Sequence, residues 1–274
     1  MAAFRPPGSS GPRAISAEGM GSGVEVQPLV ATRRGWTRFL LGLILVYATF
    51  QVSATELRSD RGERGVAVCA LVLAALVAVE RGLHGTPMRE MARALGLGWP
   101  RPGGLVAATS VAALLVGGAS GVAAAFDVTW KMTPGWSSTV PGLFAQAGVA
   151  EEALFRGYLF GRLRRGRTFR RAALLSLLPF VGVHVVLFFT MPWPIATAAV
   201  VLSAVLAVPL AWLYELSGST VWAPALLHFV VQGTVKVVDV SGPAGTQLPL
   251  FWMVTCTLVI PWVLRIRPPA PRSS

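Results

Sequence analysis

Long apolar segments, separated by short polar ones, constrain the fold of this chain more than any other feature. About eight lie between residues 37 and 266, and most have close to the roughly 20 residues that a helix needs to cross a bilayer. Of the 274 residues, 54% are hydrophobic and 13% are charged, whereas soluble domains carry roughly 25% charged residues. Backbone groups in lipid must find their hydrogen-bond partners within the protein, so helices are the expected spanning elements. The sequence therefore predicts an all-α, polytopic membrane helix bundle.

The apolar segments form one membrane domain, predicted at residues 37–266, because no long polar block is left for a second domain. The flanking segments are basic and rich in Pro or Gly, and we expect residues 1–36 to be a disordered tail and residues 267–274 to be a C-terminal tail. Val52-Ser53-Ala54 resembles a signal-peptidase site, but the region before the first apolar run is far longer than a signal n-region. We therefore expect the first helix to be retained. The predicted spans are residues 37–54, 65–83, 104–126, 139–162, 172–190, 195–216, 221–238 and 250–264.

The net charge of +12 comes mostly from arginines in alternate loops. If the N-terminus is inside, the arginine-rich segments at 1–36, 84–103, 162–171 and 265–274 all fall inside as well, as the positive-inside rule requires. The sequence thus predicts a multi-pass plasma-membrane protein with both termini cytoplasmic. The basic charge is spread over loops rather than gathered on one face, which excludes a nucleic-acid partner.

A few polar residues lie deep within the predicted spans. They are Glu151, Glu152, Arg156, His184, His228 and Gln232. Ionisable groups at membrane depth are costly and are functional-site hypotheses by default. At 1.5 Å per residue, Glu151 is roughly 16–18 Å from either end of its helix, and the two histidines reach similar depths. They are therefore expected to line one cavity that opens toward the cytoplasm.

The two adjacent glutamates are predicted to have different tasks. Glu152 and Arg156 are four residues apart and share one helix face, so they can form an ion pair. Glu151 points about 100° away around the helix and is free to face another partner. The paired carboxylate is expected to position the site, and the free one to transfer protons.

Other polar residues are expected to have no role in the site. Glu80 and Glu215 lie near helix ends, where they can reach water, and His84 lies in a loop where it is expected to be solvated. Cys69 and Cys256 are in apolar runs and are expected to be small buried side chains without a disulfide.

The spacing of these residues resembles the three-motif signature of the CPBP family, the CAAX-processing (Rce1-type) and bacteriocin-processing proteases. The motifs are Glu151-Glu152-x-x-x-Arg156, Phe180-x-x-x-His184 and His228-x-x-x-Gln232, and the resemblance covers residues 139–238. It implies an all-α intramembrane endopeptidase that hydrolyses a membrane-embedded or lipid-proximal peptide.

The resemblance also implies a role for each residue. Glu151 would activate the water, His184 would orient it, and His228 with Gln232 would stabilise the oxyanion. Glu152, Arg156 and Phe180 would support the site. A carboxylate in a low-dielectric cavity has the raised pKa that a general base needs near neutral pH. We expect a glutamate mechanism without a cofactor, although Glu151, His184 and His228 also form a possible zinc ligand set.

One residue departs from the family pattern, because Gln232 stands where the family usually has Asn. The extra methylene moves the amide by about 1.5 Å, while an oxyanion donor must lie close to 3 Å from the developing charge. This favours a second hypothesis, a non-catalytic immunity or scaffold protein of the same fold. A third hypothesis is a proton or small-solute transporter, but the chain has no internal repeat of the kind that transporters show.

Overall fold

The computed structural model describes residues 32–57, 62–240 and 243–267. The two predicted tails lie almost entirely outside these ranges. The first half of the described chain contains α1 (Arg33–Glu56), α2 (Gly65–Gly82), α3 (Met88–Ala94), α4 (Pro102–Ala125), β1 (Trp130–Met132) and α5 (Trp136–Leu143), followed by the π-helices η1 (Phe144–Ala150) and η2 (Ala153–Phe160) and by α6 (Gly161–Arg164). The second half contains α7 (Phe169–Gly182), the 3-10 helix η3 (Val183–Phe189), α8 (Trp193–Leu216), α9 (Trp222–Val237), β2 (Val238–Val240), α10 (Pro243–Val259) and the 3-10 helix η4 (Ile260–Arg265).

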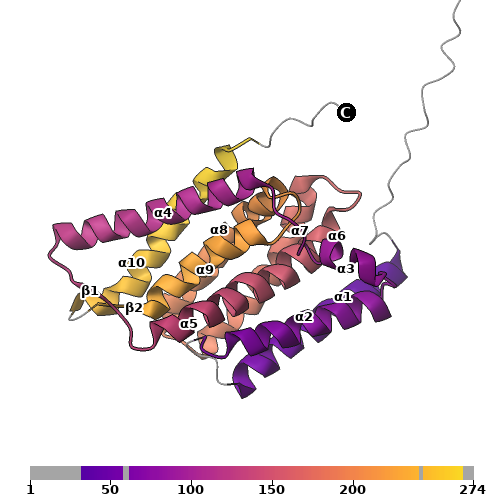
Figure 1. Ribbon diagram of the computed structural model, residues 1–274, viewed down its shortest axis with the longest axis horizontal. Coiled ribbons are helices and arrows are strands. Elements are labelled where there is room, and N and C mark those ends of the chain that lie inside the picture. Colours follow the sequence, from indigo (N-terminus) through magenta and orange to yellow (C-terminus); the bar gives the residue numbers. More distant parts are fainter. Residues whose placement is uncertain (1–31, 58–61, 241–242, 268–274) are drawn as a thin grey trace, which may run out of the picture.

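The bundle is helical, as predicted, and its helices lie roughly alongside one another. Helices α1 and α2 line one edge in Figure 1, α4 lines the opposite edge, and α9 and the α5–α6 segment run between them. Contacts follow the same order, because α2 packs on η1, η1 on α9, and α9 on α4. Helices α7, α8 and α10 pack against one another in turn. The segments that carry the deep polar residues are thus enclosed by the rest of the bundle.

Six helices of the described chain are long and apolar enough to cross a membrane. They are Arg33–Glu56, Gly65–Gly82, Pro102–Ala125, Phe169–Phe189, Trp193–Leu216 and Gln247–Arg265. The other two predicted spans, 139–162 and 221–238, do not meet this criterion. Helix α9 has only 16 residues, and the α5–α6 segment is divided and carries the buried charges. Both segments lie inside the bundle, where a polar side chain can find a protein partner.

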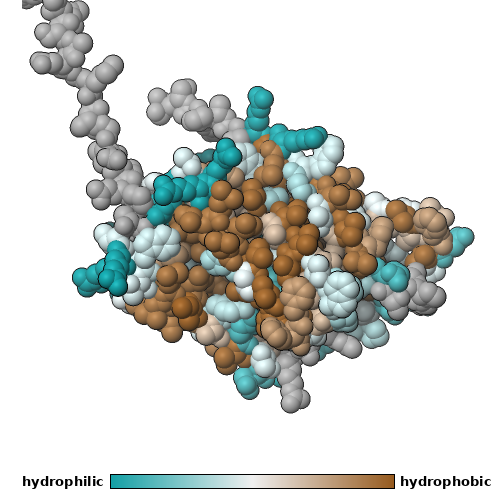
Figure 2. All heavy atoms as spheres, turned by 180° about the vertical axis from the view of Figure 1, so that it is seen from behind, coloured by the Kyte–Doolittle hydropathy of each residue, from teal (hydrophilic) through white to brown (hydrophobic). Residues whose placement is uncertain are grey.

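The surface of the bundle is largely apolar. Figure 2 shows apolar side chains across the middle of one face, with hydrophilic ones concentrated along its margins. Large hydrophobic side chains are exposed on several of the long helices, among them Ile44 on α1, Leu114 on α4, Leu178 on α7 and Leu258 on α10. Apolar patches this extensive do not occur on soluble monomers. The surface is that of a protein whose solvent is lipid.

Two short strands correct the prediction of a purely helical chain. Strands β1 and β2 pair antiparallel, with Lys131 opposite Asp239 and Trp130 opposite Val240. The sequence analysis left residues 130–132 and 239–240 between spans and placed Val238 at the end of a span, because three residues are too few to show the alternation of a strand. The pairing joins the chain after α4 to the chain after α9, at one end of the bundle (Figure 1).

Candidate active site

Glu151 and Glu152 lie between two π-helical stretches, η1 and η2, within one continuous helical segment. Hydrogen bonds in a π-helix span five residues instead of four, and such segments are frequent at functional sites. Gly148, in η1, allows α9 to approach closely, because a Cβ there would lie 3.0 Å from the carbonyl oxygen of Ala225. This close contact brings the polar side chains of α9 to those of the glutamate segment.

Glu152 is fully buried and holds two partners with one carboxylate oxygen. Its Oε1 accepts from Nη1 of Arg156 at 2.9 Å and from Nδ1 of His228 at 2.7 Å. The predicted ion pair between Glu152 and Arg156 is therefore confirmed. Because a carboxylate only accepts, Nδ1 of His228 must carry the proton. The side chains of Arg156 and His228 are each 3% exposed, so this part of the cluster is shielded from solvent.

Glu151 lies on the more accessible side of the same cluster, with its side chain 13% exposed. The amide nitrogen of Gln232 lies 3.4 and 3.5 Å from its two carboxylate oxygens. The same nitrogen lies 2.9 Å from Nε2 of His228. Since Nδ1 of that ring is the protonated nitrogen, Nε2 accepts from the Gln232 amide. Gln232 therefore bridges Glu151 and His228. The distance from Oε2 of Glu151 to Nε2 of His228 is itself 3.8 Å.

Phe180 packs at the centre of the cluster and connects it to His184. The guanidinium of Arg156 lies 4.2 Å from the centroid of the Phe180 ring, which is a cation–π distance. The rings of His228 and His184 lie 6.5 and 5.1 Å from that of Phe180. Nδ1 of His184 donates to the carbonyl oxygen of Phe180 at 2.7 Å. This bond leaves Nε2 of His184 as the unprotonated acceptor.

The structure therefore brings the seven predicted site residues together in one cluster. They are Glu151, Glu152, Arg156, Phe180, His184, His228 and Gln232. His184 joins the cluster through Phe180, and among the described residues it forms no hydrogen bond to Glu151. The 3-10 helix η3 begins at Val183, so His184 lies where the α7 helix changes its geometry.

The possible zinc ligand set does not fit this geometry. Among the described residues, no group of three or more His, Cys, Asp and Glu side chains is arranged to hold a metal ion. His228 contributes one nitrogen to Glu152 and the other to Gln232, so neither is directed at a position shared with Glu151 and His184. No chemical step is therefore assigned to a metal below.

A second buried ionic group was missed by the sequence analysis. Glu80 is 1% exposed and is paired with Arg162, which is also buried, so the expectation that Glu80 reaches water is wrong. His84 is likewise not freely solvated, because its Nε2 lies 3.0 Å from the hydroxyl of Tyr158. The sequence does contain one signal of this pair, because Glu80 and Arg162 both lie at the predicted cytoplasmic ends of their spans. Cys69 and Cys256 are buried and free, as predicted.

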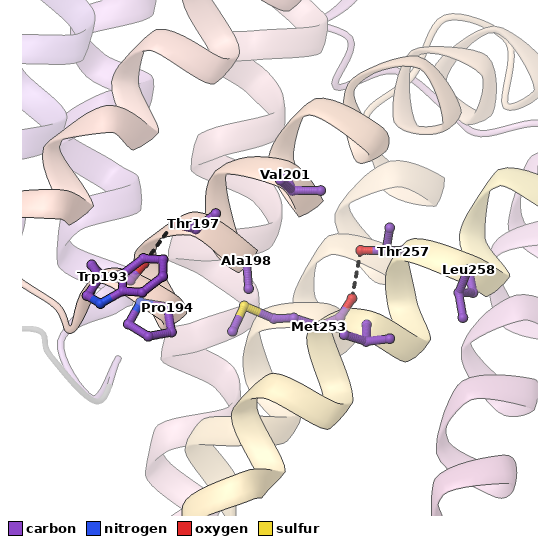
Figure 3. Close-up of a pocket in the computed structure, with 9 residues that line it drawn as sticks. Trp193, Pro194, Thr197, Ala198, Val201, Met253, Thr257 and Leu258 are labelled. Atoms are coloured by element: carbon purple, nitrogen blue, oxygen red, sulfur yellow. Dashed lines mark hydrogen bonds between the residues drawn. The ribbon is translucent and has the colours of Figure 1, made fainter.

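Surface grooves of the bundle lie away from the polar cluster. One of about 360 Å³ runs between the start of α8 and α10, lined by Trp193, Thr197, Val201, Met253 and Leu258 among others (Figure 3). Its hydroxyls bond their own helices, as when Thr257 donates to the carbonyl of Met253. A lining whose hydroxyls are bonded within their own helices, and which contains no ionisable side chain, can hold an apolar chain but offers no group that could activate water.

Comparison with known proteins gives one match. Residues 133–234 match the model of a family described as type II CAAX prenyl endopeptidase Rce1-like. This segment is less than half of the chain, yet it contains all seven predicted site residues and agrees with the resemblance seen in the three motifs. No curated protein and no solved structure matches the chain.

Proposed function

We propose that this chain, whose residues 133–234 match the model of the Rce1-like family of endopeptidases, hydrolyses a peptide bond of a membrane-associated protein with water activated by Glu151. One observation carries the proposal. Glu152 is fully buried and bonded to Arg156 and His228, whereas Glu151 is partly accessible and has weak contacts, at 3.4 and 3.5 Å, with the amide of Gln232. A general base needs an accessible carboxylate without a strong partner, and Glu151 is the one that meets this need.

In the proposed reaction, Glu151 takes a proton from water while the oxygen of that water attacks the carbonyl carbon of the substrate. The second hydrogen of the water donates a hydrogen bond to Nε2 of His184, which the bond of this ring to Phe180 leaves unprotonated. Collapse of the tetrahedral intermediate breaks the C–N bond, and the proton on Glu151 passes to the leaving amine. One proton of the water therefore ends on the amine, and the other stays on the oxygen of the new carboxyl group.

The oxyanion is proposed to receive the amide of Gln232 and the ring of His228. In the present arrangement the amide donates to Nε2 of His228, so it must turn toward the substrate oxygen. Nε2 can donate once it has taken a proton from solvent, to which it returns that proton after product release, and Glu152 stabilises the imidazolium through Nδ1. Arg156 holds Glu152 in place through their ion pair.

We also propose eight spans, with both termini in the cytoplasm of a plasma-membrane protein. Contacts between loops support this arrangement. Segments assigned to the cytoplasmic side meet one another, since Val221 donates to the carbonyl of Gly96 and Arg164 pairs with Glu215. Segments assigned to the other side meet as β1 and β2. Labelling of single cysteines introduced at Trp99 and Lys131 from each side of the membrane would test the assignment, which requires opposite accessibility.

The function is tested by cleavage of membrane-spanning peptides with the purified protein in detergent. We expect wild type to cleave, and His184→Ala and His228→Ala to lower kcat by at least about 10²-fold, the usual contribution of a positioned proton-transfer group. A chelator is expected to leave the wild-type rate unchanged, because both ring nitrogens of His228 are bonded, one to Glu152 and one to Gln232. Equal rates for wild type and both variants would support the non-catalytic relative and contradict the protease.

Gln232 supplies a second test, because its length decides which groups it reaches. Gln232→Leu keeps the volume but removes the amide, and we expect kcat to fall about 10²–10³-fold, as for other lost oxyanion donors. Gln232→Asn keeps the amide but shortens its reach by about 1.5 Å, so we expect an intermediate kcat. Gln51→Leu is the matched control, since Gln51 lies in α1 and bonds Tyr47. A Gln232→Asn variant faster than wild type would contradict the fit of Gln232 to this pocket.

A further inference from the structure

A buried polar cluster joins the N-terminal hairpin to the glutamate segment at the predicted cytoplasmic end of the bundle. We call it the hairpin cluster and define it by the residues Glu80, His84, Thr86, Tyr158 and Arg162. Three of these residues lie outside the segment that matches the Rce1-like family model. Two others, Tyr158 and Arg162, follow the site residue Arg156 on the same helical segment.

The ionic half of the hairpin cluster is built around Glu80. Arg162 donates through Nε to Glu80 Oε1 at 3.0 Å and through Nη2 to Oε2. The hydroxyl of Thr86 donates to Oε2 at 2.6 Å. A bidentate arginine–carboxylate pair fixes both distance and orientation. Because both partners are buried, this pair sets the position of α6 relative to α2 more strictly than a surface pair would.

The second half of the cluster seats Tyr158 against α1. The Tyr158 hydroxyl donates to the backbone carbonyl of Phe39 at 3.0 Å, so it must accept from Nε2 of His84. The rings of Tyr158 and Phe39 are stacked at 5.8 Å. Gly42 is required at the next turn of α1, because a Cβ there would lie 2.2 Å from the Tyr158 hydroxyl oxygen. The absence of a side chain at Gly42 thus leaves room on α1 for the Tyr158 ring.

We propose that the hairpin cluster holds the glutamate segment in register with α9, and that Glu80, Tyr158 and Arg162 are positioning residues of the active site. Every residue of η2 is buried, so the segment between Arg156 and Tyr158 cannot move outward into solvent without losing its packing. A shift of Tyr158 along α1 is therefore transmitted to Glu152, whose bond to His228 joins the two halves of the site. The proposal rests on the proposed function, and it gives α1 and α2 a role in it.

The cluster is a fixed support and not a pH switch in the neutral range. Burial and the positive charges of Arg162 and Arg38 lower the pKa of His84 to about 4, although the negative charge of Glu80 acts to raise it. The ring is therefore neutral at all pH values well above 4, with its proton on Nε2 and directed at Tyr158. Since the pKa is lowered on folding, burial of the neutral ring contributes to stability above the ordinary value of 6.5, and this contribution is lost as the pH falls toward 4 and the ring becomes charged.

The experiment uses three variants of the full chain, Tyr158→Phe, Glu80→Gln and Arg162→Lys. The last keeps the positive charge but removes the bidentate hydrogen bonding of the guanidinium. We expect kcat per folded molecule to fall about ten- to a hundredfold, as for other distant changes that misplace reacting groups, with KM within about twofold. Tyr47→Phe and Glu90→Gln are the matched controls, because Tyr47 bonds Gln51 and Glu90 is exposed beside Arg89. Both controls should retain the wild-type kcat.

A second readout does not depend on cleavage. The chain has three histidines, so nitrogen NMR of protein labelled at histidine can resolve each ring. In wild type we expect His228 to be protonated at Nδ1 and His84 at Nε2, and in the three cluster variants we expect the His228 signals to shift. Shifted signals in a protein that cleaves nothing would uphold the positioning role and reject the protease. Unchanged His228 signals together with an unchanged kcat would overturn the positioning role, even if the protease is established.

Discussion

Glu151→Gln is expected to lower kcat for peptide cleavage by about 10²–10⁴-fold, the range for loss of a general base. The substitution keeps the size of the side chain and its contact with Gln232, but an amide cannot take a proton from water. Glu151 has no strong ionic partner in the cluster, so we expect the free energy of unfolding to change by less than about 1 kcal/mol. The measurement is the cleavage rate of a membrane peptide in detergent, at equal amounts of folded protein.

A matched control makes the result for Glu151 specific. Glu90→Gln removes an exposed carboxylate from α3 and should cleave at the wild-type rate. A Glu151→Gln variant that cleaves as fast as wild type would show that another group activates the water.

Glu152→Gln is expected to have the largest effect on stability, a loss of about 3–5 kcal/mol in the free energy of unfolding. Glu152 is fully buried, and its carboxylate carries the charge that compensates Arg156. The substitution leaves the buried guanidinium of Arg156 without the carboxylate that it pairs with. It also weakens the hydrogen bond between residue 152 and His228. The measurement is reversible unfolding in mixed micelles, followed by helix content.

The double variant Glu152→Gln with Arg156→Met is the control for this interpretation. Removing both charges abolishes the uncompensated guanidinium, so we expect much of the lost stability to return. Activity should not return with it, because His228 would still lack the carboxylate that supports its protonated form. If the free energy of unfolding of Glu152→Gln equals that of wild type, the ion pair contributes little to stability. The proposed division of tasks between the two glutamates is then wrong.

The contrast between these variants would separate chemistry from support within one dipeptide. Glu151→Gln should be inactive and stable, and Glu152→Gln inactive and unstable. Spacing alone predicted this division, because residues four apart share a helix face and adjacent residues do not. The structure added the partner that spacing could not identify, since the His228 bond to Glu152 joins two helices that are far apart in the sequence.

Helices and their order were predictable because burial in lipid requires long apolar runs, and these are local in sequence. The candidate site was predictable for a related reason, because a polar residue is conspicuous against such a background. The strands at 130–132 and 238–240 were missed, since they are short and depend on a partner more than a hundred residues away. The π-helical stretches were missed as well, because helix periodicity does not distinguish them from α-helix over so few residues.

Glu80, His84 and Arg162 show where reasoning from the sequence stops. Glu80 and His84 were expected to reach water, because each lies near the end of an apolar run, and Arg162 was assigned only to a basic segment. Only the packing of α2 against the glutamate segment excludes water from them and pairs Glu80 with Arg162. Composition and spacing thus specified a membrane bundle with a carboxylate site, since these follow from the cost of charge in lipid. Which charges meet, and which remain available for chemistry, follows from contacts between distant segments and was decided by the tertiary structure.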